Sequence, residues 1–378
     1  MATASLHRAC YIKGLEFAVP ATFSRPRPSP TLFNISSSFG ISTHQPFTRP
    51  HFRRSHHQSL PYSTTSQQSE KMSHKKVIAV FGATGNQGGS VINALLQDAE
   101  ICKHYRFRGV TRDTRKPASQ ELEAQGVEMV VADMNSTETA RPAVEGAHTV
   151  FFVTNFWEGM SAEKEIAQGR HVTDAAKAAG VKHLLFSSLI NVTEATNGRL
   201  PHVTHFDGKA EIEKYIRACG IPATFVQPGY FMVNLTSAIR NRGDGTFILS
   251  LPIDANKAQF PLMDVSNDYG KFVKAGIKHF PATSGKTIYA AGSYYTPNEL
   301  LKEFSEVMGV ETAFQKIDAD TFKSFMTPKV AQELLENMLL LEEPGYFGGA
   351  DLAESLSLLD EAPCSWKDFV QANRDCWL

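Results

Sequence analysis

The segment that most constrains the fold is the glycine-rich sequence VIAVFGATGNQGGS at Val77–Ser90. A short apolar run, Val77–Phe81, ends at Gly82, and Gly85 and Gly88 follow before an amphipathic helical pattern begins. Gly82 allows a tight turn, Gly85 lets a pyrophosphate approach the backbone, and Gly88 lets the helix pack closely on the strand. An ordinary glycine-rich turn is the alternative. The order of strand, turn and helix favours a dinucleotide site, with the phosphates at the helix N-terminus.

From Val77 onward, apolar segments alternate with amphipathic helical patterns. Strands are predicted at residues 77–81, 107–111, 127–133, 149–154, 183–189 and 223–227, and helices at 90–98, 137–145, 162–179 and 207–218. This alternation predicts an α/β fold, a Rossmann-type doubly wound parallel sheet with helices on both faces. Ligands of such sheets bind at the carboxyl ends of the strands.

The last third of the chain is less regular. Strands are predicted at 247–251 and 287–290, and helices at 266–279, 296–308, 328–341 and 365–374. Thr296, Pro297 and Glu299 form the pattern of a capped helix start. We therefore expect a Rossmann domain at residues 73–240 and a smaller C-terminal α+β lobe, for substrate or partner, at residues 241–378.

Residues 1–72 differ in composition from the rest of the chain. They hold eight basic and two acidic side chains with abundant serine and proline, a composition that cannot bury a core. Basic residues among Ser and Thr are typical of a mitochondrial transit peptide. Alternatively, the native protein starts at Met72, directly before the first strand, and is cytoplasmic. Composition does not separate a mitochondrial from a cytoplasmic protein.

Charge and cysteine usage narrow the function classes. Residues 73–378 carry 30 basic and 37 acidic side chains, a net charge of −7. An acidic body argues against direct nucleic-acid binding, which needs a basic face. The five cysteines show no spacing typical of a metal site, so no metal is expected. No apolar run reaches the ~18 residues of a membrane span, so no membrane interaction is expected.

The end of the second predicted strand indicates which dinucleotide is bound. Arg112 follows this strand at the position where the 2′-phosphate of NADP would lie, and Arg115 and Lys116 come soon after. A guanidinium binds phosphate bidentately, so NADP is favoured over NAD. Asp113 could instead serve the ribose of NAD if it pointed inward. Asp133, after the third strand, is expected beside the adenine.

Several segments resemble the NmrA-like family, which comprises atypical relatives of the short-chain dehydrogenases. The resemblance extends from Lys75 to Leu378 and includes GATGNQGGSV, the Thr111-Arg112 strand end, VTNFWE at Val153–Glu158 and, most specifically, the HFDGKAEIEKY segment within Thr204–Asn234. It implies a Rossmann core, a small C-terminal lobe and NADP(H) binding. The family includes fungal transcriptional regulators, NADPH/NADP redox sensors and oxidoreductases of fungal secondary metabolism.

The resemblance also implies which residues contact the cofactor. These are Gly82, Ala83, Thr84, Gly85, Asn86, Gln87, Arg112, Thr154, Asn155, Phe156, Lys209, Gln227, Pro228, Gly229 and Tyr230. Gly88 is predicted at the cofactor as part of the glycine turn itself.

The catalytic residues of the short-chain dehydrogenases are only partly present. Their Tyr-x-x-x-Lys pattern places a proton-donating tyrosine one helical turn before a lysine. Lys209 is in place here, but His205 stands where the tyrosine would be. His205 or Tyr230 could donate the proton, or His205 could simply be a polar residue at a helix start. Tyr230, Phe231, Phe156 and Trp157 could form an aromatic wall over the nicotinamide or belong to the core.

Two functions remain open at this point. The first is an NADP(H)-dependent oxidoreductase of a small metabolite, with a conjugated one favoured because its reduction needs little acid assistance. The second is a non-catalytic NADP(H) sensor that controls a protein partner, such as a transcription factor. Both functions are compatible with a homodimer.

Overall fold

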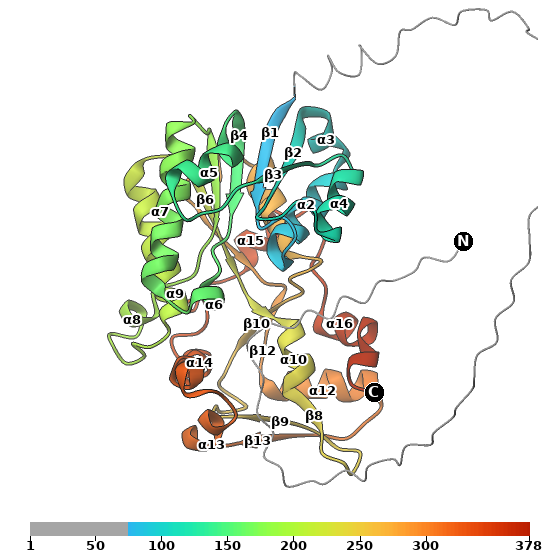
Figure 1. Cartoon of the computed structure of the whole chain (residues 1–378). Coiled ribbons are helices and arrows are strands. Elements are labelled where there is room, and N and C mark those ends of the chain that lie inside the picture. Colours follow the sequence, from blue (N-terminus) through green and yellow to red (C-terminus); the bar gives the residue numbers. More distant parts are fainter. Residues whose placement is uncertain (1–74) are drawn as a thin grey trace, which may run out of the picture. The chain divides into compact units, whose positions relative to one another are not determined.

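The computed structural model describes residues 75–378, and the transit peptide or alternative start predicted for residues 1–72 lies outside this range. Its central element is a parallel sheet of seven strands (Figure 1). The strands are β1 (Lys76–Phe81), β2 (Tyr105–Thr111), β3 (Glu128–Val131), β4 (Ala147–Phe152), β5 (His183–Ser187), β6 (Ala223–Pro228) and β11 (Thr287–Ala290). The predicted Rossmann-type fold is therefore confirmed.

The strand order of this sheet is β11-β6-β5-β4-β1-β2-β3. After β3 the chain crosses to the other side of β1, so the order reverses between β1 and β4. In a doubly wound sheet a ligand binds outside the carboxyl ends of the strands at this reversal. The loops that follow β1 and β4 are therefore the first place to look for a site.

Helices cover both faces of the sheet. One layer consists of α2 (Asn86–Leu96), α3 (Ala99–His104), α4 (Pro117–Ala124) and α11 (Tyr269–Lys278), and the other of α5 (Thr137–Val144), α7 (Ala162–Ala178) and α9 (Thr204–Cys219). Side chains of β1 alternate between them. Val77, Ala79 and Phe81 pack with the α5, α7 and α9 layer, while Ile78 and Val80 pack with α2 and α11.

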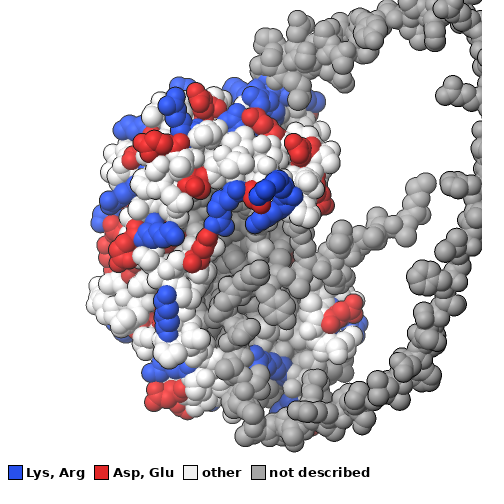
Figure 2. Space-filling model, in the orientation of Figure 1, with Lys and Arg blue, Asp and Glu red and all other residues white. Residues whose placement is uncertain are grey.

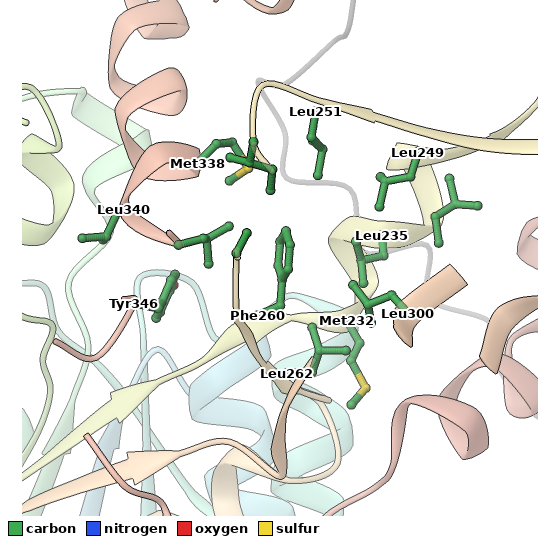
Figure 3. Packing of buried hydrophobic residues seen from close by; sticks show 14 of the residues in the cluster. Met232, Leu235, Leu249, Leu251, Phe260, Leu262, Leu300, Met338, Leu340 and Tyr346 are labelled. Carbon is green, nitrogen blue, oxygen red and sulfur yellow. The ribbon is translucent and has the colours of Figure 1, made fainter. Parts of the chain in front are cut away.

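Most of the C-terminal region forms a second lobe with two small sheets. One is β12 (Ser293–Tyr295), β10 (Phe260–Met263) and β7 (Tyr230–Phe231), and the other is β13 (Thr312–Lys316), β9 (Phe247–Leu251) and β8 (Ile239–Asn241). Its main helices are α10 (Met232–Ala238), α12 (Pro297–Met308), α13 (Ala319–Ser324), α14 (Pro328–Leu340) and α16 (Trp366–Ala372). Figure 3 shows the core between them, with Leu251, Phe260, Leu300 and Met338 converging from four elements.

Two segments after residue 240 belong to the Rossmann layers rather than to this lobe. The strand predicted at 287–290 is β11, and it pairs in parallel with β6 at the edge of the large sheet. Helix α11 packs beside α2 over the same sheet. The domain boundary at residue 240 therefore stays a prediction. After this residue, the chain returns once to the Rossmann layers, where it forms α11 and β11.

Element bounds agree well with the sequence where the periodicity is long. The predicted strand at 247–251 is β9, and the predicted cap at Thr296 forms a full capping box with Glu299. The third strand is shorter than predicted, because β3 is an edge strand that pairs only with β2. Helix α9 begins at Thr204, three residues earlier than predicted, so His205 and Lys209 lie on the same helix. The remaining short elements are α6 (Phe156–Gly159), α8 (Val192–Ala195), α15 (Ala353–Ser357) and the 3₁₀ turn Arg374–Cys376.

Candidate functional site

The glycine turn after β1 has the geometry of an anion-binding turn. Gly82 has φ +67°, and its carbonyl accepts a 2.8 Å hydrogen bond from the Gly85 amide. Helix α2 then begins at Asn86 with Gly85 as the N-cap, and its first turn has neither a capping side chain nor an acidic residue. The positive end of the helix dipole is therefore not neutralised by its own residues.

Gly88 is fixed by packing. A Cβ at this position would lie 2.2 Å from the carbonyl oxygen of Gly82, a distance that no side chain tolerates. The helix can approach the strand end only because this residue is glycine, as the sequence predicted. Beside it, Ala83 is buried and Thr84 half-buried, and Gln87 Oε1 accepts a 2.6 Å hydrogen bond from Ser187 Oγ at the end of β5.

Arg112 follows β2 and is 67% exposed. Its guanidinium forms an ion pair with Glu158 of α6, which comes directly after β4. Asp113 is engaged locally, since its carboxylate accepts hydrogen bonds from the amide and the Nε of Arg115. These bonds lower the pKa of Asp113. Asp113 is therefore occupied by Arg115, whereas Arg112 extends across the carboxyl edge of the sheet toward the end of β4. At this position its guanidinium could bind a phosphate.

Asp133 has a structural role at the end of β3. Its Oδ1 accepts hydrogen bonds from Thr139 Oγ1 at 2.7 Å and from the Asn135 amide at 2.8 Å. The bond from Thr139 is the largest influence on its pKa, which lies below the usual range. These contacts hold the loop between β3 and α5, and a contact of Asp133 with adenine stays a prediction.

Lys209 is buried in a polar cluster at the end of β4. Its Nζ donates to Thr154 O (3.0 Å), Thr154 Oγ1 (2.8 Å) and Glu165 Oε1 (2.6 Å). An ammonium has three N–H donors, so all of them are occupied. Glu165, which sequence reasoning missed, is 2% exposed, and its Oε2 has no hydrogen-bond partner among the described residues. A ribose hydroxyl would therefore have to replace one of the partners of Lys209.

His205 stands one turn before Lys209 and is held by a residue from the other lobe. Its Nδ1 lies 2.7 Å from Oε1 of Glu333 in α14. The same oxygen accepts from the His205 amide at 2.8 Å and from Thr204 Oγ1 at 3.1 Å. Nothing in the sequence indicated this pair, because 128 residues separate its members and α14 looks like an ordinary amphipathic helix. The sequence indicated no partner for His205, and in the structure this partner is Glu333.

The end of β6 and the residues directly after it, Gln227 to Tyr230, lead from the large sheet into the C-terminal lobe. Gln227 is buried, and its Oε1 has no hydrogen-bond partner within residues 75–378. Pro228 ends β6, and the Gly229 amide donates to Ala290 O at 2.9 Å. Burial raises the pKa of Tyr230 to about 12. Its ring packs edge-on against Phe260 at 5.0 Å between centroids.

The four aromatic residues predicted as a wall do not all pack together. Phe156 is buried and meets Trp157 edge-on at 5.3 Å, and both contact the ring of His205. Tyr230 packs against the core of the C-terminal lobe, whereas Phe231 packs against the sheet. A shallow hollow beside this region is lined by Asn155, Phe156, Glu158, Gly159, Ser161, Lys164, Glu165 and Gln168.

The residues at this edge fit a bound dinucleotide. Gly88 lets α2 pack closely on the end of β1, and the turn at Gly82–Gly88 leads directly into the positive end of α2, which has no capping side chain. Gln227 offers a buried amide oxygen that has no hydrogen-bond partner in the described part of the chain. Contacts from Gln87 to Ser187, from Arg112 to Glu158 and from Lys209 to Thr154 join the ends of β1, β2, β4 and β5 and helix α9. Within residues 75–378, no group of three His, Cys, Asp or Glu residues could hold a metal ion, and no helix has the length and apolar character to cross a bilayer.

The family model and the curated relatives that match this chain point to the same family. The family model described as NmrA-like family matches residues 74–369. An NmrA-like family domain-containing oxidoreductase, ptmS of Penicillium ochrochloron, is 32% identical over 269 residues, which cover 66% of this chain and 78% of the relative. The oxidoreductase lnaB of Aspergillus flavus is 29% identical over 298 residues, covering 73% of this chain and 87% of that protein.

Solved structures share the fold. The negative transcriptional regulator NmrA, which has also been solved in complex with NADP, superposes with a TM-score of 0.67 at 24% identity. The match covers 79% of this chain and 95% of NmrA. Citrobacter sp. triphenylmethane reductase complexed with NADP(H) gives a TM-score of 0.63 at 22% identity, covering 78% of this chain and 99% of the reductase.

Proposed function

The chain belongs to the NmrA-like family, and on this premise we propose that it is an NADP(H)-dependent oxidoreductase of a small metabolite. The observation that carries the proposal is the cluster at the end of β4, where Lys209 is 8% exposed and His205 lies one turn before it on α9. A buried lysine and a histidine with a carboxylate partner, beside a dinucleotide-type turn, are the components of a reductase site. The names of the fungal relatives support the same activity.

The parts of the site divide the work of binding. The N-terminus of α2 would hold the pyrophosphate, and the glycine turn would let it approach the backbone. Arg112 would exchange Glu158 for the 2′-phosphate, which would favour NADP(H) over NAD(H). When bound, the nicotinamide supplies or accepts a hydride. Lys209 would lie at its ribose, with Thr154, Asn155 and Phe156 alongside.

A small organic substrate suits this site better than a nucleic acid. Acidic and basic side chains are interspersed on the described part of the face drawn in Figure 2, without an extended basic area. The aromatic rings of Phe156 and Trp157 next to His205 would favour a flat, conjugated substrate. Reduction of a polarised C=C or C=N bond is therefore the reaction class that we propose.

Hydride transfer is tested directly with isotope-labelled NADPH. The full chain is incubated with NADPH deuterated at nicotinamide C4 and with cyclohex-2-enone, a cyclic imine or malachite green, and deuterium in the product is measured by mass spectrometry. The control variant carries Lys209→Met together with Glu165→Met, because removing one charge alone would leave the other buried and unpaired. Deuterium on carbon in a wild-type product, and none with the control, supports the proposal. Tight NADPH binding without any labelled product contradicts it and favours a non-catalytic sensor with a protein partner.

A further inference from the structure

We propose that Glu333 is a positioning residue that holds His205 by Nδ1, so that Nε2 of His205 donates a proton to the reduced substrate. This inference rests on the proposed reductase function. It assigns His205 as the proton donor of the site. Because Glu333 lies in α14 of the C-terminal lobe, this lobe would contribute to the reaction.

The contacts of Glu333 are concentrated on one oxygen. Its Oε1 accepts from the amide and the Nδ1 of His205 and from Thr204 Oγ1, at 2.8, 2.7 and 3.1 Å. Glu333 itself is only 8% exposed. A carboxylate that accepts from both the backbone and the ring of one histidine fixes the position and the orientation of the imidazole. It also holds the neutral proton on Nδ1 and stabilises the ring when it is doubly protonated.

The imidazole leaves its other nitrogen available. No hydrogen bond to Nε2 is found among residues 75–378. The ring has two close aromatic neighbours, with centroid distances of 4.9 Å to Trp157 and 4.8 Å to Phe206. A histidine with Nδ1 bound to a carboxylate and Nε2 without a partner has the arrangement used for general acid–base catalysis.

His205 lies where a proton donor is needed. It precedes Lys209 by four residues, hence by about one turn, on α9. Its ring contacts Phe156 at 5.9 Å between centroids, and Phe156 directly follows the loop at the end of β4. The strand order reverses between β1 and β4, which is where a nicotinamide would lie in this fold.

Tyr230 is the weaker candidate for this role. Burial raises its pKa to about 12, so the phenol holds its proton more tightly than a free tyrosine. Its ring contacts are with Phe260 and Tyr346, and its pKa shift has no contribution from a cationic side chain. Because Lys209 is directed to Thr154 and Glu165, it does not activate Tyr230 as a lysine does for the tyrosine of related dehydrogenases.

Helix α14, which carries Glu333, packs into the core of the C-terminal lobe. Its Leu335 and Met338 are buried in the core of the C-terminal lobe (Figure 3 labels Met338). A second pair of the same kind, His202 with Glu336, joins α14 to the segment before α9, with 2.6 Å between Nδ1 and Oε1. The His202 side chain is 60% exposed, whereas that of His205 is 12% exposed. The pair of His202 and Glu336 therefore joins the two elements, but its imidazole is open to solvent.

The proposed step balances with the cofactor as the reductant. In the reduction of an enone, the β-carbon gains the hydride, and the C=C electron pair moves to form an enolate. The doubly protonated ring of His205 gives its Nε2 proton to this enolate and is left neutral with its remaining proton on Nδ1, and solvent then returns a proton to Nε2. In the reduction of a triphenylmethane cation, the central carbon gains the hydride and the product is neutral. That second reaction needs no proton.

Because only enone reduction needs a proton, comparing the two reactions separates the loss of a proton donor from general damage to the site. Wild-type full chain, His205→Ala and Glu333→Gln are compared in NADPH-dependent reduction of cyclohex-2-enone and of malachite green. Glutamine keeps an oxygen that can accept from the three donors but removes the charge. We expect the ratio of enone reduction to dye reduction to fall about 100-fold in His205→Ala and about tenfold in Glu333→Gln. Glu336→Gln is the matched control, and it should leave the ratio of the two rates unchanged.

The tautomer of His205 is an independent readout in the protein without cofactor. In ¹⁵N-histidine spectra, with His205→Gln used for assignment, we expect the neutral proton of His205 on Nδ1. A neutral proton on Nε2, or an equal loss of enone and dye reduction in His205→Ala, would overturn the inference while the reductase function stands. If the wild type binds NADPH and reduces neither acceptor, the reductase function fails and this inference fails with it.

Discussion

Arg112 and Glu158 form an ion pair that links the end of β2 to the helix after β4. Both side chains are largely exposed, so the pair itself contributes little to stability. Its position is more informative, because the predicted 2′-phosphate partner of NADP is already bound to a carboxylate. A bound phosphate must therefore compete with Glu158 for the guanidinium.

This competition predicts opposite effects for the two substitutions. Arg112→Ala should weaken NADPH binding about tenfold and leave NADH binding nearly unchanged, because only NADPH has the 2′-phosphate. Glu158→Gln should strengthen NADPH binding about two- to fivefold, which is the range for an exposed ion pair. Isothermal titration of the full chain with both nucleotides measures these changes. Equal affinities for NADPH and NADH that Arg112→Ala does not alter would count against the assignment.

Adjacent glycines in α2 should respond differently to alanine. A Cβ on Gly88 would lie 2.2 Å from Gly82 O, whereas a Cβ on Gly89 would lie 3.4 Å from Ala83 O. Gly88→Ala should therefore displace the turn, lower the free energy of unfolding by about 1–3 kcal/mol and abolish NADPH binding. Gly89→Ala should be neutral or stabilising by up to about 1 kcal/mol, since alanine is the better helix former. Urea unfolding and nucleotide titration of both variants check this, and equal behaviour would contradict the packing argument.

The sequence predicts the large sheet well because local signals determine it. The glycine turn, the alternating apolar strands and the capped helix starts are all visible within short windows. In the C-terminal lobe, β9 and α12 agree with their predicted bounds almost to the residue for the same reason. The short lobe strands such as β7 and β8 were missed, because two or three residues carry no periodicity. The place of β11 in the large sheet was missed because pairing with β6 is set by tertiary packing.

The site was predictable only for residues in motifs. His205 and Lys209 were found because their spacing is that of a known pattern. Glu165 and Glu333 were not, because they act through contacts with residues distant in the sequence and stand in helices with other charged residues. A buried acidic side chain looks like a solvated one until its partner is known.

Lys209 and Glu165 should be strongly coupled in stability. Both are buried, and each is the other's only ion-pair partner among the described residues. Lys209→Met would leave the carboxylate of Glu165 buried without its cation, which should lower the free energy of unfolding by about 3–5 kcal/mol. The double variant with Glu165→Met should recover most of this loss. A double-mutant cycle in urea measures the coupling, and simple additivity of the two effects would refute it.

His183 should make stability depend on pH. It is buried at the start of β5, where Nε2 lies 2.8 Å from Thr224 Oγ1 and the ring stacks on Phe280. The Thr224 hydroxyl donates to Thr283 O, so Nε2 carries the proton, and Nδ1 has no hydrogen-bond partner among the described residues. Burial, with a smaller contribution from the charge of His148, lowers the pKa of His183 to about 3.

The sign of the effect follows from where the proton binds. Between the folded pKa of about 3 and the unfolded value of ~6.5, the unfolded chain binds the proton and the folded chain does not. Stability from this group is therefore complete above pH ~6.5 and falls by up to about 1.4 kcal/mol per pH unit as the pH drops below it. In His183→Asn this part of the slope should vanish. Urea unfolding of both proteins at pH 7.0, 5.5 and 4.5 gives the comparison, since ~pH 5 lies inside the window. Parallel slopes would show that His183 is protonated in the folded state and that the buried, neutral ring is the wrong description.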